Sequence, residues 1–238
     1  MPGPLVAALK SRAHIAPGIV DLVFELRDPP RFAFKAGQFV SFAVVDATGA
    51  ALPRRSYSIA SQTTEDDRLR FIVRVIEGGA ASDHLMGLEI GDEQSLTGPH
   101  GFFTLDAAHA GDVVFGATGT GMAAVMPMLG ELAARPETGR RFVYWGARQE
   151  SDLFARAEIE ALAARAGATL SIHLTAPGPA WTGGRGRITA AILEALPGLA
   201  SPTFYLVGNG AMITELKREL VARGVNRKAQ IRTEAFFD

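Results

Sequence analysis

The stretch VVFGATGTGMA, residues 113–123, decides how the second half of the chain is interpreted. The apolar residues Val113 to Phe115 predict a buried strand, the glycines and threonines that follow predict a tight turn, and Met122 begins an apolar run typical of a buried helix. Small residues in such a turn let backbone amides approach a pyrophosphate. The spacing differs from the dinucleotide fingerprint Gly-x-Gly-x-x-Gly, and no lysine follows as in a P-loop. The stretch therefore predicts a strand–turn–helix unit whose backbone binds a diphosphate.

Downstream of this stretch, strands and helices alternate to the end of the chain. Further strands are predicted at residues 142–145, 169–174, 203–207 and 230–237. Helices are predicted at residues 122–134, 152–165, 189–196 and 211–223. This alternation indicates a parallel sheet covered on both faces, which binds its ligands at the C-terminal ends of the strands.

In the first half of the chain, the sequence instead shows short β-rich runs separated by turn residues. The runs cover residues 22–26, 38–45, 57–60 and 69–76, with one short helix predicted at 81–87. Their spacing is typical of an antiparallel barrel or sandwich. We therefore expect two domains, an antiparallel β-barrel over residues 1–106 and an α/β domain over residues 107–238.

Composition excludes several classes of function. Twenty-four basic and twenty-five acidic residues leave a net charge of −1, so no global attraction to nucleic acid or anionic membranes is encoded. The absence of cysteine excludes disulfides, thiolate catalysis and cysteine-ligated iron–sulfur clusters. The five histidines, at positions 14, 84, 100, 109 and 173, lack metal-ligand spacing, and no Gly-x-Ser-x-Gly elbow is present. We expect no metal.

Two stretches bear on location. Residues 113–130 carry no charge, but four glycines, two threonines and Pro127 favour a strand, a turn and a buried helix over a membrane span. Residues 1–18 lack the basic start and apolar run of a signal peptide. We expect a cytoplasmic protein that does not associate with membranes.

The first-half motif RRSYSI, residues 54–59, combines an anchor with a flat ring. Alternation along a strand places Arg55 and Tyr57 on one face with Ile59, and Ser58 lies beside them. Such a face suits a planar ring and a phosphate. A strand with one exposed arginine satisfies the same pattern.

The next motif, RVIEGGAAS at residues 74–82, places two glycines before a short helix. Backbone amides and the Ser82 hydroxyl converge where a diphosphate would sit, helped by the helix dipole. An ordinary turn with a serine N-cap is the alternative.

Three features of the second half complete the set. Residues 205–212 form another strand–glycine–helix unit. Arg148 follows the second strand, where an adenosine phosphate would suit it, although a solvent-facing arginine explains it equally well. Phe236 and Phe237 at the end of the chain need a surface to cover, either the core or a flat ring.

In this order the motifs resemble the ferredoxin–NADP reductase superfamily, in which an FAD-binding barrel precedes a domain that binds NADP(H) or NAD(H). The resemblance implies that Arg55 binds the FAD diphosphate, Tyr57 stacks on the isoalloxazine and Ser58 lies near its N5. The other FAD contacts that it implies are Ile59, Arg74, Val75, Gly79, Ala81 and Ser82. The nicotinamide-nucleotide contacts that it implies are Thr118, Gly119, Thr120, Gly121, Arg148, Arg185, Gly208 and Met212.

The resemblance also assigns catalytic roles and shows departures. Tyr57, Ser58 and Phe236 are the implied catalytic residues, with Phe236 covering the flavin. Ala124 replaces a proline that is usual in the family, and Val207 replaces a common cysteine. The pair that often grips the 2′-phosphate of NADPH corresponds to Thr175 and Ala176, which carry no charge. Arg185 or Arg187 is a candidate replacement.

The implied function is hydride exchange between NAD(P)H and FAD, coupled to single-electron transfer. Because the chain cannot ligate a cluster, its partner is expected to be a separate ferredoxin, flavodoxin or oxygenase component, docked near Arg31 and Lys35 or near Arg54. We expect a monomer. The alternatives are a reductase that uses free flavin as substrate and an electron-transfer subunit of a larger complex.

Overall fold

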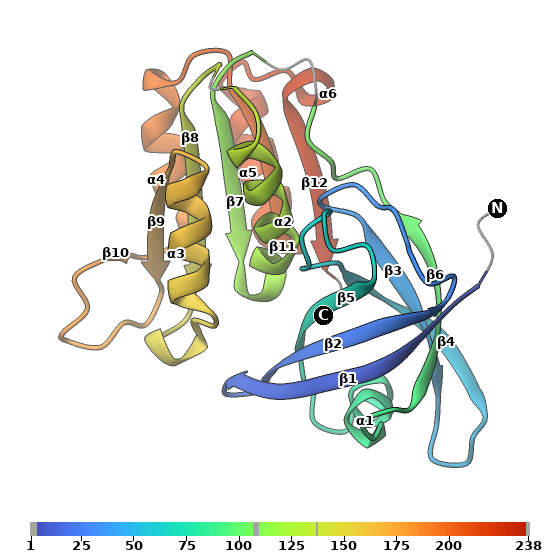
Figure 1. Cartoon of the computed structure of the whole chain (residues 1–238). Helices are drawn as coiled ribbons and strands as arrows, with labels where there is room; N and C mark the ends of the chain where they lie inside the picture. Colours follow the sequence, from blue (N-terminus) through green and yellow to red (C-terminus); the bar gives the residue numbers. More distant parts are fainter. Residues whose placement is uncertain (1–3, 107–109, 137, 237–238) are drawn as a thin grey trace. The chain divides into compact units, whose positions relative to one another are not determined.

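The computed structural model describes residues 4–106, 110–136 and 138–236 of the chain. The chain divides into two compact units, Met1–Thr104 and Leu105–Asp238, and each is described by itself (Figure 1). The sequence had placed this division two residues later. Phe237 and His109 lie outside the described residues.

The first unit is a six-stranded antiparallel sheet in the order β4-β3-β6-β1-β2-β5 (Figure 1). Its elements are β1 (Leu5–Ala16), β2 (Ile19–Asp28), β3 (Phe39–Val45), β4 (Ala51–Ser58), β5 (Arg68–Arg74), α1 (Ala80–Gly87) and β6 (Glu93–His100). The predicted antiparallel fold of the first half is therefore confirmed.

The core of this unit is built around three phenylalanines from three strands. Phe24, Phe42 and Phe71 are fully buried, and their rings meet edge to face with centroids 4.9 to 6.0 Å apart. Edge-to-face packing is a favoured geometry for aromatic pairs. The three strands are thereby fixed against one another, and Phe42 also contacts Tyr57 of the motif at residues 54–59.

Two details of the first half differ from the sequence expectation. The run predicted at 57–60 belongs to a longer strand, β4, which ends at Ser58 and lies at the edge of the sheet, where Pro53 is tolerated. Strands β1 and β6 were not among the predicted runs. The second half of β1 is largely exposed and polar, and β6 contains Gly98 and Pro99, so neither shows clean alternation.

The second unit is a six-stranded parallel sheet in the order β10-β9-β8-β7-β11-β12. Its strands are β7 (Val113–Thr118), β8 (Arg141–Ala147), β9 (Ala168–Leu174), β10 (Gly184–Arg185), β11 (Thr203–Asn209) and β12 (Ile231–Phe236). Its helices are α2 (Met122–Ala133), α3 (Arg156–Arg165), α4 (Ile188–Ala195), α5 (Gly210–Ala222) and α6 (Arg227–Gln230). Helices α2 and α3 cover one face and α4 and α5 the other (Figure 1), so the predicted α/β half is confirmed.

The deciding stretch folds as a strand, a turn and a helix. Strand β7 extends to Thr118, a single 3₁₀ turn covers Gly119–Gly121, and α2 follows, almost wholly buried. In the described part of the chain, no helix has the length and apolar character needed to cross a membrane.

Candidate functional site

Tyr57 lies near the end of β4, opposite Val40 of β3. Its ring is half-buried and meets Phe42 edge-on, with centroids 5.2 Å apart and planes at 88°. Burial raises the pKa of its hydroxyl, and the charge of Arg55 offsets part of that rise. The phenol is therefore neutral at physiological pH and offers an uncharged, partly exposed ring surface.

The neighbours of Tyr57 differ in what they offer a ligand. Arg55 is exposed, and its Nη1 donates to the carbonyl oxygens of Pro53 at 3.0 Å and Arg54 at 3.3 Å. Exposed bonds of this kind exchange readily with those to a phosphate. Ile59 was expected to share the ring's face, but it lies beyond the strand with a fully buried side chain, so a ligand can meet only its backbone.

The turn between β5 and α1 presents an uncapped helix start. Gly78 has a positive φ of 67°, Gly79 is the N-cap, and no side chain caps the helix. Free amides at a helix N-terminus carry partial positive charge and favour anions. This geometry fits the diphosphate expected there.

Ser82 has a different local role from the serine N-cap considered as the alternative. Its side chain is buried, and its Oγ accepts the backbone N–H of Ile76 at 2.8 Å. The serine therefore ties the glycine turn to the helix, and the hydroxyl retains its own proton for donation.

The two motifs of the first unit border one core. Tyr57, Val75 and Ala81 are partly buried and pack against the same apolar cluster. Arg74, at the end of β5, is exposed. The strand that carries Tyr57 and the start of α1 thus pack against one common core.

In the second unit, the turns after β7 and β11 are in close contact. Gly208 has a positive φ of 111°, and a Cβ there would lie 2.4 Å from Thr118 Oγ1 and 2.6 Å from its carbonyl oxygen. A Cβ on Gly121 would lie 2.9 Å from the carbonyl oxygen of Val207. The structure thereby brings together both glycine turns at the C-terminal edge of the sheet.

Hydrogen bonds hold these turns. Thr118 Oγ1 accepts the backbone N–H of Asn209 at 2.8 Å, and the Asn209 side chain accepts the N–H of Met212 at 3.0 Å. Gly119, with a φ of +52°, offers its carbonyl oxygen to Trp145 Nε1 at 3.2 Å. Thr120, which follows Gly119 in the same turn, is half-buried. No pattern in the sequence predicted these hydrogen bonds of Asn209 and Trp145.

The three arginines at this edge of the sheet differ in their hydrogen-bond and ion-pair partners. Arg185 Nη2 donates to the carbonyl oxygens of Trp181 at 3.1 Å and Gly178 at 3.4 Å, and Arg187 lies 3.8 Å from Glu215. Among the described residues, no hydrogen bond or ion pair holds the Arg148 guanidinium, which is exposed. The Arg148 carbonyl oxygen accepts the N–H of Ala176 at 2.7 Å, so Arg148 adjoins the uncharged pair at 175–176.

His173 was not expected at this edge. It pairs with Gly146 across the strands, its Nε2 lies 2.9 Å from Ser171 Oγ, and its buried Nδ1 has no partner among the described atoms. Burial lowers the pKa of the imidazole. A Cβ on Gly184 would lie 2.4 Å from that Nδ1, so the glycine makes room for the ring.

Phe236 is half-buried in β12, opposite Asn209 of β11. It therefore lies at the same strand ends as Gly208. The sequence left open whether it completes the core or covers a ring, and its half-buried side chain leaves a surface for either contact.

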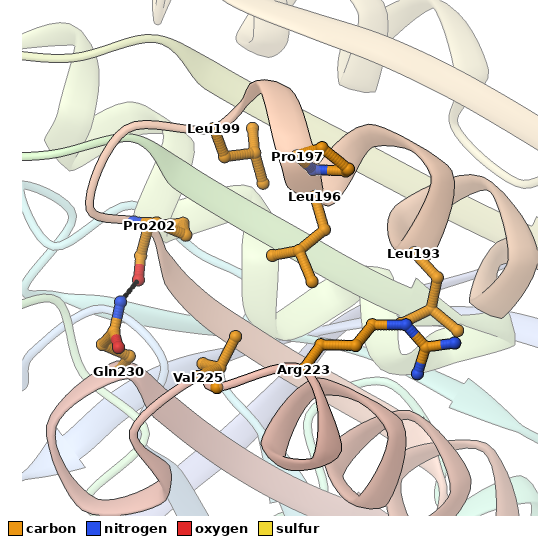
Figure 2. A pocket seen from close by; sticks show the side chains of 9 residues that line it. Leu193, Leu196, Pro197, Leu199, Pro202, Arg223, Val225 and Gln230 are labelled. Carbon is orange, nitrogen blue, oxygen red and sulfur yellow. Dashed lines mark hydrogen bonds between the residues drawn. The ribbon is translucent and has the colours of Figure 1, made fainter.

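Two surface hollows of the second unit lie at the opposite edge of the sheet. One of about 420 Å³ is lined by leucines and prolines that precede β11 and by residues 223–225 and Gln230, which precede β12 (Figure 2). Gln230 donates to the Pro202 carbonyl oxygen at 2.8 Å. Another of about 520 Å³ adjoins Asp112 and Arg140 before β7 and β8. Neither belongs to the edge that carries the glycine turns. Within the described ranges, no cluster of three potential ligands could hold a metal ion.

Two protein-family models match the two halves of the chain. The oxidoreductase FAD-binding domain matches residues 6–105, and the oxidoreductase NAD-binding domain matches residues 115–218. Among curated relatives, ferredoxin–NADP reductase B of Sorangium cellulosum is 36% identical over 228 residues, covering 93% of this chain and 92% of that protein. The phenol 2-monooxygenase reductase component of a Pseudomonas species is 34% identical over 63% of this chain, which spans 41% of that protein.

Solved structures show the same fold. The cytochrome P450 reductase GcoB of Amycolatopsis has a TM-score of 0.86 at 29% identity, covering 98% of this chain and 70% of that one. A ferredoxin–NADP⁺ reductase of Neisseria gonorrhoeae has a TM-score of 0.84 at 21% identity, covering both chains fully, which shows a shared fold.

Proposed function

Because the chain belongs to the ferredoxin–NADP reductase superfamily of FAD- and NAD(P)H-dependent oxidoreductases, we propose that it couples a nicotinamide cofactor to a separate ferredoxin, flavodoxin or oxygenase component. FAD supplies the conversion, since it accepts electrons in pairs and releases them singly. The protein's part is to bind, orient and exclude water.

In the first unit, the proposal assigns the isoalloxazine to Tyr57 and Ser58, and the diphosphate to Arg55 and the start of α1. The supporting observation is that α1 begins with no side-chain cap, beside a positive-φ glycine. Ser82 provides a hydroxyl proton at the same turn. Arg74, Val75, Gly79, Ala81 and the backbone of Ile59 complete the proposed FAD contacts.

In the second unit, the proposal assigns the nucleotide diphosphate to residues 118–121, and the nicotinamide to the turn at Gly208 and Met212. The close contact between the two glycine turns supports this, because only residues without side chains leave such backbone accessible. We assign the adenosine phosphate to Arg148, which lies beside Ala176 and has no described partner. This assignment favours NADPH over NADH. Phe236 is proposed to cover the flavin.

The choice of Arg148 revises the candidates considered from sequence. Arg185 donates to two carbonyl oxygens of its own loop, and Arg187 pairs with Glu215. Moving either guanidinium to a phosphate would break those contacts. Arg185 is therefore assigned to shaping the loop that borders the phosphate.

The acceptor is proposed from the relatives and the composition. Relatives include a ferredoxin–NADP reductase and reductase components of monooxygenases, and the chain holds no cysteine for a cluster of its own. Of the proposed docking residues, Lys35 is exposed, Arg31 pairs with Asp66 at 3.2 Å, and Arg54 donates to the Ser41 carbonyl oxygen at 3.1 Å. A monomer in the cytoplasm, where NAD(P)H is available, completes the proposal.

Gel filtration of the FAD-loaded chain tests this function against its main alternative. FAD is expected to co-elute with the protein, and the eluted protein should reduce an added ferredoxin or flavodoxin with NADPH. If the flavin elutes separately, and NAD(P)H oxidation returns only when free flavin is added, the chain is a flavin reductase instead. An obligate partner found on purification would indicate a subunit of a larger complex.

A further inference from the structure

The Arg12 side chain closes the C-terminal end of α1. Its Nη1 lies 2.6 Å from the carbonyl oxygen of Met86, 3.0 Å from that of Leu88 and 3.4 Å from that of Leu85. The last carbonyls of a helix lack intrahelical partners and carry partial negative charge. A half-buried guanidinium from β1 therefore satisfies the end of a helix more than seventy positions away in the chain.

The rest of α1 is held by separate contacts. Leu85 is buried in the core, and Ser82 accepts the N–H of Ile76. His84 Nε2 lies 2.8 Å from Oε1 of Gln94, which is itself buried. A helix of eight residues is marginal without tertiary contacts, so its direction depends on these anchors. Of the contacts named here, only those of Arg12 act on the terminal carbonyls.

We propose that Arg12 is a positioning residue for the FAD diphosphate, acting through α1. The inference rests on the proposed FAD site, which places the diphosphate at the uncapped start of this helix. The cation at one end and the anion at the other both favour the helix dipole, so each strengthens the other's effect. Without the guanidinium, the last turn loses its partners, and the direction of the first-turn amides depends on the remaining anchors alone.

The test compares FAD with riboflavin, which carries the same ring and no phosphate. The variant Arg12→Met keeps much of the apolar stem but removes the charge and the donors. We expect its Kd for FAD to rise by about three- to thirty-fold, the upper part of the range of charge effects at helix ends. Its Kd for riboflavin should stay within about twofold of wild type, because riboflavin has no phosphate to bind at the start of α1.

Arg12→Lys is the conservative rescue, and it also serves if Arg12→Met folds poorly. It keeps the charge and should recover much of the FAD affinity without changing riboflavin binding. Arg27→Met is the matched control, because Arg27 lies on the adjacent strand β2 and, among the described residues, pairs with half-buried Glu25 alone, at 3.0 Å. Circular dichroism fixes a temperature at which every variant is folded before ligand is added.

The outcomes separate the two proposals. Equal losses of FAD and riboflavin affinity in Arg12→Met would mean that Arg12 supports the barrel generally, and would overturn the inference. So would an unchanged FAD affinity in a wild-type background that binds FAD. Failure of the wild-type chain to bind FAD at all would overturn the proposed function together with the inference.

Discussion

We expect Tyr57 to act through its ring, with its hydroxyl secondary. The ring is half-buried against Phe42, and burial holds the hydroxyl neutral. Tyr57→Ala should therefore weaken FAD binding about tenfold or more, since stacking on an aromatic side chain is worth about 1–3 kcal/mol. Tyr57→Phe keeps the ring and should bind FAD within about threefold of wild type. Titration of flavin fluorescence gives both constants, and equal damage by the two substitutions would contradict the stacking role.

Arg148 is expected to decide between the two nicotinamide cofactors. Arg148→Gln should lower kcat/KM for NADPH by about ten- to hundred-fold, the effect of losing a charge-assisted hydrogen bond, and leave NADH nearly unchanged. Steady-state kinetics with both cofactors measure the ratio. Arg165→Gln, at another exposed arginine in the last turn of α3, is the control. A parallel loss for NADH and NADPH would place the Arg148 guanidinium away from the 2′-phosphate.

His173 links the stability of the second unit to pH. Burial lowers the pKa of its imidazole below the ordinary value of about 6.5, so the unfolded chain binds this proton more readily than the folded chain. The contribution is complete above that pH and is lost as pH falls below it toward the folded-state pKa. Urea unfolding at a series of pH values should show a shallower acid slope in His173→Gln than in wild type. His14→Gln, at an exposed position, is the matched control.

At the scale of elements, the two glycine turns of the parallel sheet can be tested with a matched pair. Gly208 and Gly224 both have a positive φ, but only Gly208 would bring a Cβ against neighbouring atoms. Gly224→Ala should cost about 1–2 kcal/mol from backbone strain alone. Gly208→Ala adds the clash with Thr118, and should cost more and also weaken nucleotide binding. Equal costs in thermal unfolding would mean that the turns are looser than the structure shows.

The central strands of the parallel sheet could be predicted because β7 and β11 are buried on both faces. Apolar runs and amphipathic helices then alternate without interruption, and the helix predicted at 122–134 is observed at Met122–Ala133. The strands of the antiparallel half were harder to predict from the sequence. Exposed residues such as Lys10 and His14 interrupt the alternating pattern of β1, and Pro53 is unusual in a strand such as β4.

The turns of the site could be predicted, but their supports could not. Glycine and serine patterns are local, so they indicated the start of α1 and both glycine turns of the parallel sheet. The partners of Ser82 and Arg12 depend on the folded chain, and Arg12 bonds to Met86, seventy-four positions away. The pairing of Arg185 with its own loop is likewise invisible in sequence, which left the phosphate-binding arginine open.

For the whole molecule, the two cofactors belong to different units. The FAD-binding family model covers residues 6–105 and the NAD-binding model covers residues 115–218, and each unit has its own sheet and core. Reduction of FAD by a nicotinamide nucleotide therefore draws on both units. The proposed function depends on FAD held on Tyr57 and reduced by a nicotinamide bound at the glycine turns.

An anaerobic titration of the FAD-loaded chain with NADPH, and separately with NADH, tests that dependence most directly. The visible absorption of the flavin should bleach with stoichiometric NADPH, require more NADH, and return when a one-electron acceptor is added. A protein that keeps no FAD, or whose bound FAD stays oxidised with both nicotinamides, would contradict it.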